Sequence, residues 1–381
     1  MRELLEILGR IVKLAKAGHP AALATVVSTS GSTYRRPGAR LLITESDAVG
    51  AVSAGCLEDE VIALAQRVVE SGQPQLIRFD TTEEMDAIAG TGLGCRGTIE
   101  VFIESLAPEH SGAFFYRTLQ KALRQDRSPI LTLMVESNTP QVPIGTHFVF
   151  IDDESYDVFE EDIGEPFMSE QIGQDLHLVS SWKPTVTKWY ELQSGSVRVY
   201  WERMEPPSKL LLFGAGYDAQ PLVKLANELG FRVTVVDHRP TYLTRKRFPK
   251  ANQLVQAHPR ELHSKIHMDH CTFVVIMSHN YLHDLEILKF ALQSEAPYIG
   301  QMGPLNRTQE LLAEIGKGLG PLLAEKLARL HAPVGLNLGA ESPEEIALSI
   351  MSEILAVKNA REAGFLKERK TPIHIDEAPE I

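Results

Sequence analysis

The chain has 381 residues and a formal net charge of −12. This length favours two or more compact parts over a single hydrophobic core. The acidic balance argues against a general nucleic-acid or anionic-membrane surface, so neither partner is expected.

The sequence is typical of a cytoplasmic protein. No apolar stretch approaches the length that crosses a bilayer, and the first residues form an amphipathic helix pattern rather than a signal peptide. The three cysteines, Cys56, Cys95 and Cys271, are an odd number without CxxC spacing. They indicate free thiols in a reducing compartment rather than disulfides or a zinc site.

The first part of the chain, residues 1–105, is predicted to be an α+β domain. Its opening helix is expected to end before Gly18, because glycine suits the position after a helix. The patterns also predict a helix at 57–69 and strands at 21–29, 40–44, 48–53, 75–80 and 98–104.

Residues 106–207 are interpreted as a β-containing extension of that domain and a linker. A helix is expected near 112–124, with strands at 129–136 and 197–202. The consecutive prolines Pro206 and Pro207 stiffen the chain and mark the linker.

Residues 208–368 change to an alternation of strands and helices, followed by a polar tail at 369–381. Such alternation predicts a parallel sheet with helices on both faces. The last helix, near 343–361, has Ser342 as its N-cap and Glu345 at the capping-box position. The predicted fold class is therefore α/β: a C-terminal Rossmann-like parallel sheet domain plus an N-terminal α+β domain with a β-rich extension.

A glycine-rich turn follows the strand predicted at 210–213. Gly214, Gly216 and Ala219 form a G-x-G-x-x-A pattern that includes Tyr217, and Asp237 closes the next strand. In Rossmann folds such a turn places a phosphate at a helix N-terminus, and the acid accepts hydrogen bonds from ribose. The alternative is a Rossmann scaffold whose turn holds another ligand or none.

A second polar segment follows the strand predicted at 272–277. His279, His283 and Asp284 lie there, at the sheet edge where ligands of open α/β sheets bind. His279 and Asp284 are candidate ligand contacts. Four-residue spacing of the histidines also makes metal binding conceivable, whereas simple helix capping explains His283 better.

Several ungapped motifs, in one order along the chain, resemble the XdhC/CoxI family of accessory proteins for xanthine dehydrogenase and related molybdenum hydroxylases. They lie at residues 31–40, 53–58, 92–97, 213–216, 236–240, 247–249, 278–279 with 284, 298–300, 332–340 and 342–347. Tyr217, Arg96 and Ala54 depart from the residues that are common in the family, which affects details of ligand choice more than the fold.

The resemblance implies a chaperone for the molybdenum cofactor, molybdopterin, rather than an enzyme. Family members are understood to protect the cofactor while a cysteine desulfurase supports its sulfuration, and to insert it into an apo molybdenum hydroxylase of the xanthine dehydrogenase type. A homodimer is also expected from this resemblance.

Four residues of the first domain join the candidate cofactor site. Cys56 and Cys95 stand on glycine-flanked loops, and thiolates suit molybdenum and sulfur chemistry, although a free cysteine is often a small buried hydrophobe. Arg35 and Arg36, with Arg40 nearby, would provide an anion pocket in an acidic protein; otherwise they belong to a solvated loop.

Two enzymatic alternatives remain open from the residues alone. An NAD(P)-dependent oxidoreductase would use the glycine turn and Asp237, but a proton donor and substrate clamp beyond His279 and Asp284 are missing. A metal-dependent hydrolase would use His279, His283 and Asp284.

Overall fold

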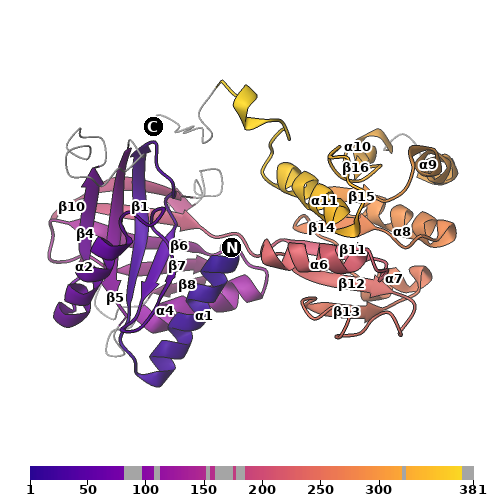
Figure 1. The fold of residues 1–381 in the computed structure, drawn as a ribbon. Coiled ribbons are helices and arrows are strands. Elements are labelled where there is room, and N and C mark those ends of the chain that lie inside the picture. The colour runs from indigo at the N-terminus through magenta and orange to yellow at the C-terminus, as the bar shows by residue number, and fades with distance from the viewer. Residues whose placement is uncertain are drawn as a thin grey trace. The chain divides into compact units, whose positions relative to one another are not determined.

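The computed structural model describes residues 1–80, 97–106, 112–151, 155–158, 175–176, 185–319 and 323–370 (Figure 1). These residues form two compact units, one from Glu3 to Pro206 and one from Pro207 onward. Within the described ranges, no helix combines the length and the apolar character that a bilayer crossing requires.

The first unit contains two sheets of five strands, and all paired strands in them run antiparallel. The first sheet, in the order β3-β2-β1-β5-β4, consists of β1 (Ala22–Gly31), β2 (Arg40–Ile43), β3 (Ala48–Gly50), β4 (Gln75–Asp80) and β5 (Gly97–Ser105). The second, in the order β8-β7-β6-β10-β9, consists of β6 (Ile130–Ser137), β7 (His147–Ile151), β8 (Ser155–Val158), β9 (Thr185–Leu192) and β10 (Gly195–Arg203).

The helices α1 (Arg2–Ala17), α2 (Glu58–Ser71) and α4 (Gly112–Arg124) cover these sheets. The apolar face of α2 packs on β1 and β5, and α1 and α4 share a second cluster with strands of both sheets. Val27 and Phe102 of the first sheet meet Leu133 and Tyr200 of the second. Burial of these apolar faces holds the two sheets together as one core.

The region at 106–207 contains more strands than the two expected from the sequence. It supplies a complete five-stranded sheet, in which β7, β8 and β9 were not predicted from the sequence. The predicted helix end is confirmed, because Gly18 adopts the left-handed conformation at φ 72° and closes α1.

The second unit is built on a parallel six-stranded sheet in the order β13-β12-β11-β14-β15-β16. Its strands are β11 (Lys209–Phe213), β12 (Arg232–Asp237), β13 (Gln253–Gln256), β14 (Thr272–Ile276), β15 (Tyr298–Gln301) and β16 (Leu330–His331). The order reverses between β11 and β14, which is where open α/β sheets bind ligands.

Helices cover both faces of this sheet (Figure 1). They are α6 (Ala219–Glu228), α7 (Leu262–Lys265), α8 (Tyr281–Gln293), α9 (Leu305–Leu319), α10 (Leu323–Leu327) and α11 (Pro343–Lys358), with short 3₁₀ turns η2 (Pro259–Glu261) and η4 (Leu366–Glu368). Leu210 and Leu212 face α6 and α11, whereas Leu211 and Phe213 face α8 and α9. This alternation is the period of two that a strand imposes.

The capping box predicted for the last helix is confirmed. The Oγ of Ser342 accepts from the Glu345 N–H at 3.3 Å, and Glu345 Oε2 accepts from the Ser342 N–H at 2.9 Å. The predicted fold class is also confirmed, with an antiparallel, helix-covered first unit and a Rossmann-like second unit.

Candidate functional site

The glycine turn between β11 and α6 has a geometry that requires glycine at its first position. Gly214 has φ 112°, and a Cβ placed there would lie 2.3 Å from the carbonyl oxygen of Met277. Its N–H donates to the carbonyl of Val236 at 2.9 Å. Ala219 is fully buried, so α6 packs closely against the sheet. The turn is therefore pressed between β12 and the segment that follows β14.

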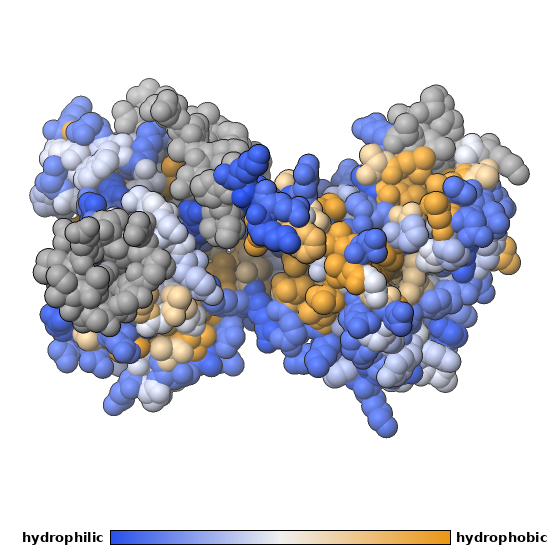
Figure 2. Space-filling model, turned by 45° about the horizontal axis from the view of Figure 1, so that its top comes forward, coloured by the Kyte–Doolittle hydropathy of each residue, from blue (hydrophilic) through white to orange (hydrophobic). Residues whose placement is uncertain are grey.

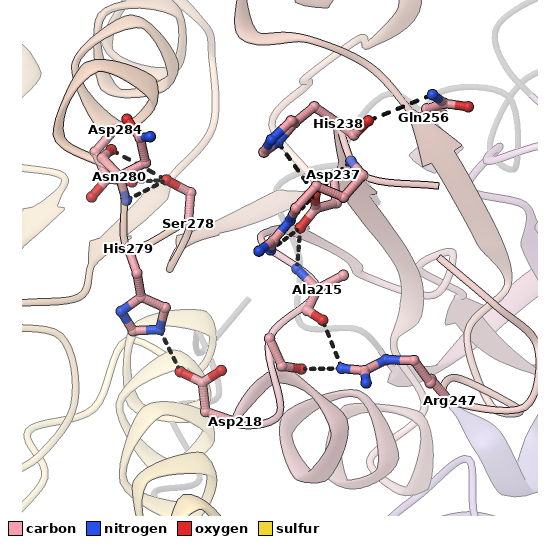
Figure 3. A network of polar contacts seen from close by, with 12 residues as sticks. Ala215, Asp218, Asp237, His238, Arg247, Gln256, Ser278, His279, Asn280 and Asp284 are labelled. Atoms are coloured by element: carbon pink, nitrogen blue, oxygen red, sulfur yellow. Dashed lines mark hydrogen bonds and ion pairs between the residues drawn. The ribbon is translucent and has the colours of Figure 1, made fainter. Parts of the chain in front are cut away.

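Arg247 fixes the orientation of the next two peptide groups. Its guanidinium donates to the carbonyl oxygens of Ala215 at 2.9 Å and Gly216 at 3.1 Å (Figure 3). In a trans peptide the C=O and N–H point in opposite directions, so the N–H groups of Gly216 and Tyr217 point away from Arg247. Those two N–H groups have no hydrogen-bond partner among the described residues. They are the donors that the turn offers to an anion.

Asp237 is not available to a ribose, which corrects the expectation from the sequence. Its side chain accepts from the Ala215 N–H at 2.8 Å and from the Arg239 guanidinium at 2.8 and 3.0 Å, and it is 2% exposed. Burial alone would raise the pKa of Asp237, but the bonds from Arg239 and Ala215 outweigh burial and lower it. The carboxylate therefore holds the turn rather than a ligand.

His279 and Asp218 connect the segment after β14 to the glycine turn. The Nε2 of His279 lies 2.7 Å from Oδ2 of Asp218 (Figure 3). His279 adopts φ 56°, a conformation that non-glycine residues rarely take. The hydrogen bond to Asp218 raises the pKa of His279. The pair lies at the N-terminus of α6, so a protonated His279 offsets the Asp218 carboxylate beside the anion donors.

Asp284 is a buried residue that binds neighbouring side chains at the same sheet edge, rather than an exposed residue that contacts a ligand. It is 1% exposed; it accepts from Ser278 Oγ at 2.5 Å and from Arg307 at 2.7 Å. Burial raises its pKa, and the bonds from Ser278 and Arg307 only partly oppose this effect. The hydrolase alternative receives no support, since no three acidic, histidine or cysteine side chains in the described ranges are placed to hold a metal ion.

Known proteins match this chain along most of its length. Residues 210–354 match the model of the XdhC Rossmann domain, and residues 14–80 match that of the XdhC and CoxI family. A Bacillus subtilis (strain 168) protein described as a probable xanthine dehydrogenase subunit is 32% identical over 344 residues, 89% of this chain and 93% of that protein. The chain belongs to the XdhC and CoxI family.

Two further known proteins also match most of this chain. The crystal structure of a xanthine dehydrogenase from Bacillus halodurans matches with a TM-score of 0.75 and 28% identity, over 94% of this chain and 97% of that one. The molybdenum cofactor insertion chaperone PaoD of Escherichia coli (strain K12) is 22% identical over 353 residues, 92% of this chain and 88% of PaoD. The family likeness therefore includes both units.

The arginines of the first unit are only partly available to an anion. Arg35 pairs with Glu3, and Arg36 lies half-buried in the same cleft. Arg40 is buried and holds Glu202 through two bonds, of 3.1 and 2.5 Å. Arg40 is therefore a structural residue, which corrects the expectation that it joins Arg35 and Arg36 in an anion pocket.

Cys56 stands exposed at the start of α2 on a well-braced loop. Oε1 of Glu58 accepts from the Ser53 N–H at 2.9 Å, and Oγ of Ser53 accepts from the Leu57 N–H at 3.1 Å. The loop therefore presents the thiol to solvent instead of packing it into the core. Cys95, the second thiol of the candidate site, lies outside the described residues. Cys271 is a partly buried thiol.

The carboxyl edge of the Rossmann sheet is rimmed by apolar side chains. Four neighbouring strands, β11, β14, β15 and β16, each lead into a segment with a large apolar residue that is more than half exposed: Tyr217, Leu282, Leu305 and Leu338. Apolar surface also gathers on one face of the second unit in Figure 2. Exposed apolar surface of this kind is typical of a binding face.

Proposed function

We propose that this XdhC and CoxI family member is a molybdenum-cofactor chaperone and not an enzyme. It holds molybdopterin, protects it while a cysteine desulfurase supports its sulfuration, and inserts it into an apo molybdenum hydroxylase of the xanthine dehydrogenase type. The name of the relative PaoD supports the cofactor and the insertion step. The name of the Bacillus subtilis relative supports the acceptor.

The observation that carries the proposal is the pair of N–H groups that Arg247 aims away from itself, at Gly216 and Tyr217. The cofactor ends in a phosphate, or in a diphosphate in its nucleotide form, and such donors at a helix N-terminus fit either group. The bound cofactor would supply the molybdenum and sulfur chemistry. The residues of this chain would bind the phosphate, and protonated His279 would offset the negative charge of Asp218 beside it.

An NAD(P)-dependent oxidoreductase is disfavoured by the same geometry. The acid that would bind a ribose, Asp237, already accepts from Arg239 and Ala215. A chaperone needs no such acceptor, because it does not have to position a nicotinamide for hydride transfer.

Four residues of the first unit are assigned supporting roles in this proposal. The exposed Cys56 contacts the cofactor or its sulfur, together with Cys95. Arg35 and Arg36 add positive charge for an anionic group. A homodimer and a transient complex with the acceptor enzyme complete the proposal, and the apolar rim that includes Tyr217 and Leu338 is a suitable contact for the acceptor.

The proposal is tested with the purified full-length chain. Mass spectrometry of the released small molecules is expected to detect molybdopterin or its nucleotide form. The loaded chain is then mixed with an apo-hydroxylase of the xanthine dehydrogenase type, whose activity should appear only with the loaded chain. A chain that neither retains molybdopterin on gel filtration nor activates the apo-enzyme would contradict the proposal.

A further inference from the structure

Three histidines from three separate segments meet beside the glycine turn. His238 follows β12, His258 precedes η2, and His283 lies in the first turn of α8. Their ring centroids are 4.6 Å apart for His238 and His283, 5.2 Å for His258 and His283, and 6.4 Å for His238 and His258. The interplanar angles are 85°, 78° and 78°, so each ring is nearly perpendicular to the other two. We call these three residues the histidine corner.

A cleft with an apolar floor lies between two of these rings, those of His238 and His283, and the glycine turn. Gly214, His238 and His283 line it, and its floor is made of buried side chains: Phe213, Val236, Ala257, Leu262 and Ile287. The cleft is open to solvent, and the space inside it that a water molecule can occupy is about 20 Å³. That volume holds about one water, so a planar ring would lie across the mouth, against the imidazole faces.

The electrostatics of the corner suit an uncharged aromatic ring. Burial lowers the pKa of His283, and His238 and His258 lower it further. His283 is therefore neutral at pH 7, and its ring face can stack without a counter-ion. Arg239 and Asp237, which line the cleft, form an ion pair with each other, and the Nδ1 of His238 lies 3.3 Å from the Asp237 carboxylate. Such perpendicular rings offer a planar ligand one stacked and one edge-to-face contact.

We propose that this histidine corner binds the base of a nucleotide whose phosphate lies on the glycine turn. The inference rests on the proposed function, since the nucleotide would be part of the cofactor in its dinucleotide form. Gly214 lines both the cleft and the turn, so one ligand reaches both. In Rossmann folds the nucleoside lies beside the end of the second strand, which His238 follows here. The ribose would lie there without a hydrogen bond to Asp237, because Arg239 and Ala215 already occupy that carboxylate.

Calorimetric titration of the full chain with CMP, GMP, AMP and inorganic phosphate tests this site. At least one nucleotide is expected to bind about tenfold or more tightly than inorganic phosphate, since stacking of one base contributes that much. The His283→Ala variant should lose about tenfold in nucleotide affinity and keep its phosphate affinity. His283→Phe restores a ring face and should retain the nucleotide.

His263→Ala is the matched control, because His263 packs on Phe290 outside the cleft and its loss should change neither affinity. Nucleotides that bind no tighter than phosphate would overturn the inference, as would an unchanged His283→Ala variant. Molybdopterin retention is measured on the same samples. If it persists without nucleotide binding, the chaperone proposal stands and only the histidine corner fails.

Discussion

Arg247 donates to the carbonyl oxygen of Ala215 at 2.9 Å, although the two residues are 32 positions apart. A second bond reaches Gly216, and together they orient the N–H groups that face a ligand phosphate. Replacing Arg247 with Ala should release both peptide groups and weaken cofactor binding by about tenfold or more, the effect of losing charge-assisted bonds. Molybdopterin retained per chain after gel filtration measures the loss.

Arg245→Ala is the matched control for that experiment. Arg245 also donates to backbone carbonyls, those of Ala251 and Asn252, but these lie away from the glycine turn. Its replacement should leave retention unchanged. If both variants lost the same amount of retained molybdopterin, the segment that carries Arg245 and Arg247 would act through general stability and not through the orientation of the glycine turn.

Gly214→Ala should destabilise the second unit by about 1–3 kcal/mol, because a non-glycine residue is strained at φ 112° and its Cβ would meet the carbonyl oxygen of Met277. Urea unfolding monitored in that unit measures the change. Gly364→Ala is the control: no atom lies within 4 Å of the position that the new methyl group would take, so stability should change by less than about 0.5 kcal/mol. A similar shift in both variants would refute the argument from backbone strain.

The elements of the Rossmann unit could be predicted because their signals are local. The strand before Gly214 is a short apolar run bounded by a turn, and Ser342 with Glu345 fixes a helix start within four residues. The second sheet of the first unit was harder. β7 reads His-Phe-Val-Phe-Ile and is buried throughout, so it lacks the alternation that identifies a strand. β9 does carry alternating Thr and Val residues, and that signal was missed.

The partners within the site could not be read from spacing along the chain. Asp237 ends a strand as a ribose-binding acid would, yet Arg239 folds back onto it two residues later. Arg247 belongs to a recognised motif, but only the fold brings it to Ala215. Chain order predicts which strand ends share an edge; it does not predict which charged side chains neutralise one another there.

The ion pair between His279 and Asp218 predicts a pH dependence. Because the folded-state pKa of His279 lies above its usual value of 6.5, the pair stabilises the fold fully below pH 6.5 and loses this contribution as the pH rises through the folded-state pKa. NMR titration of the imidazole should give a midpoint above 6.5 in the native chain. Asp218→Asn should lower that midpoint, and phosphate binding by the native chain should weaken over the same interval. A midpoint that Asp218→Asn leaves unchanged would exclude the pair as the cause.

The buried pair of Arg40 and Glu202 should contribute far more to stability than an exposed pair does. Burial would lower the pKa of Arg40, but the Glu202 carboxylate outweighs it and raises that pKa, so the guanidinium stays charged inside the first unit. Arg40→Met would leave Glu202 buried without a counter-ion, which costs about 3–5 kcal/mol in unfolding free energy. Asp47→Asn breaks the exposed pair with Arg10 and should change stability little, since solvent screens it. The denaturant midpoint of the first unit is measured for both variants. Equal midpoints would show that the buried Arg40 pair contributes no more to stability than the exposed pair.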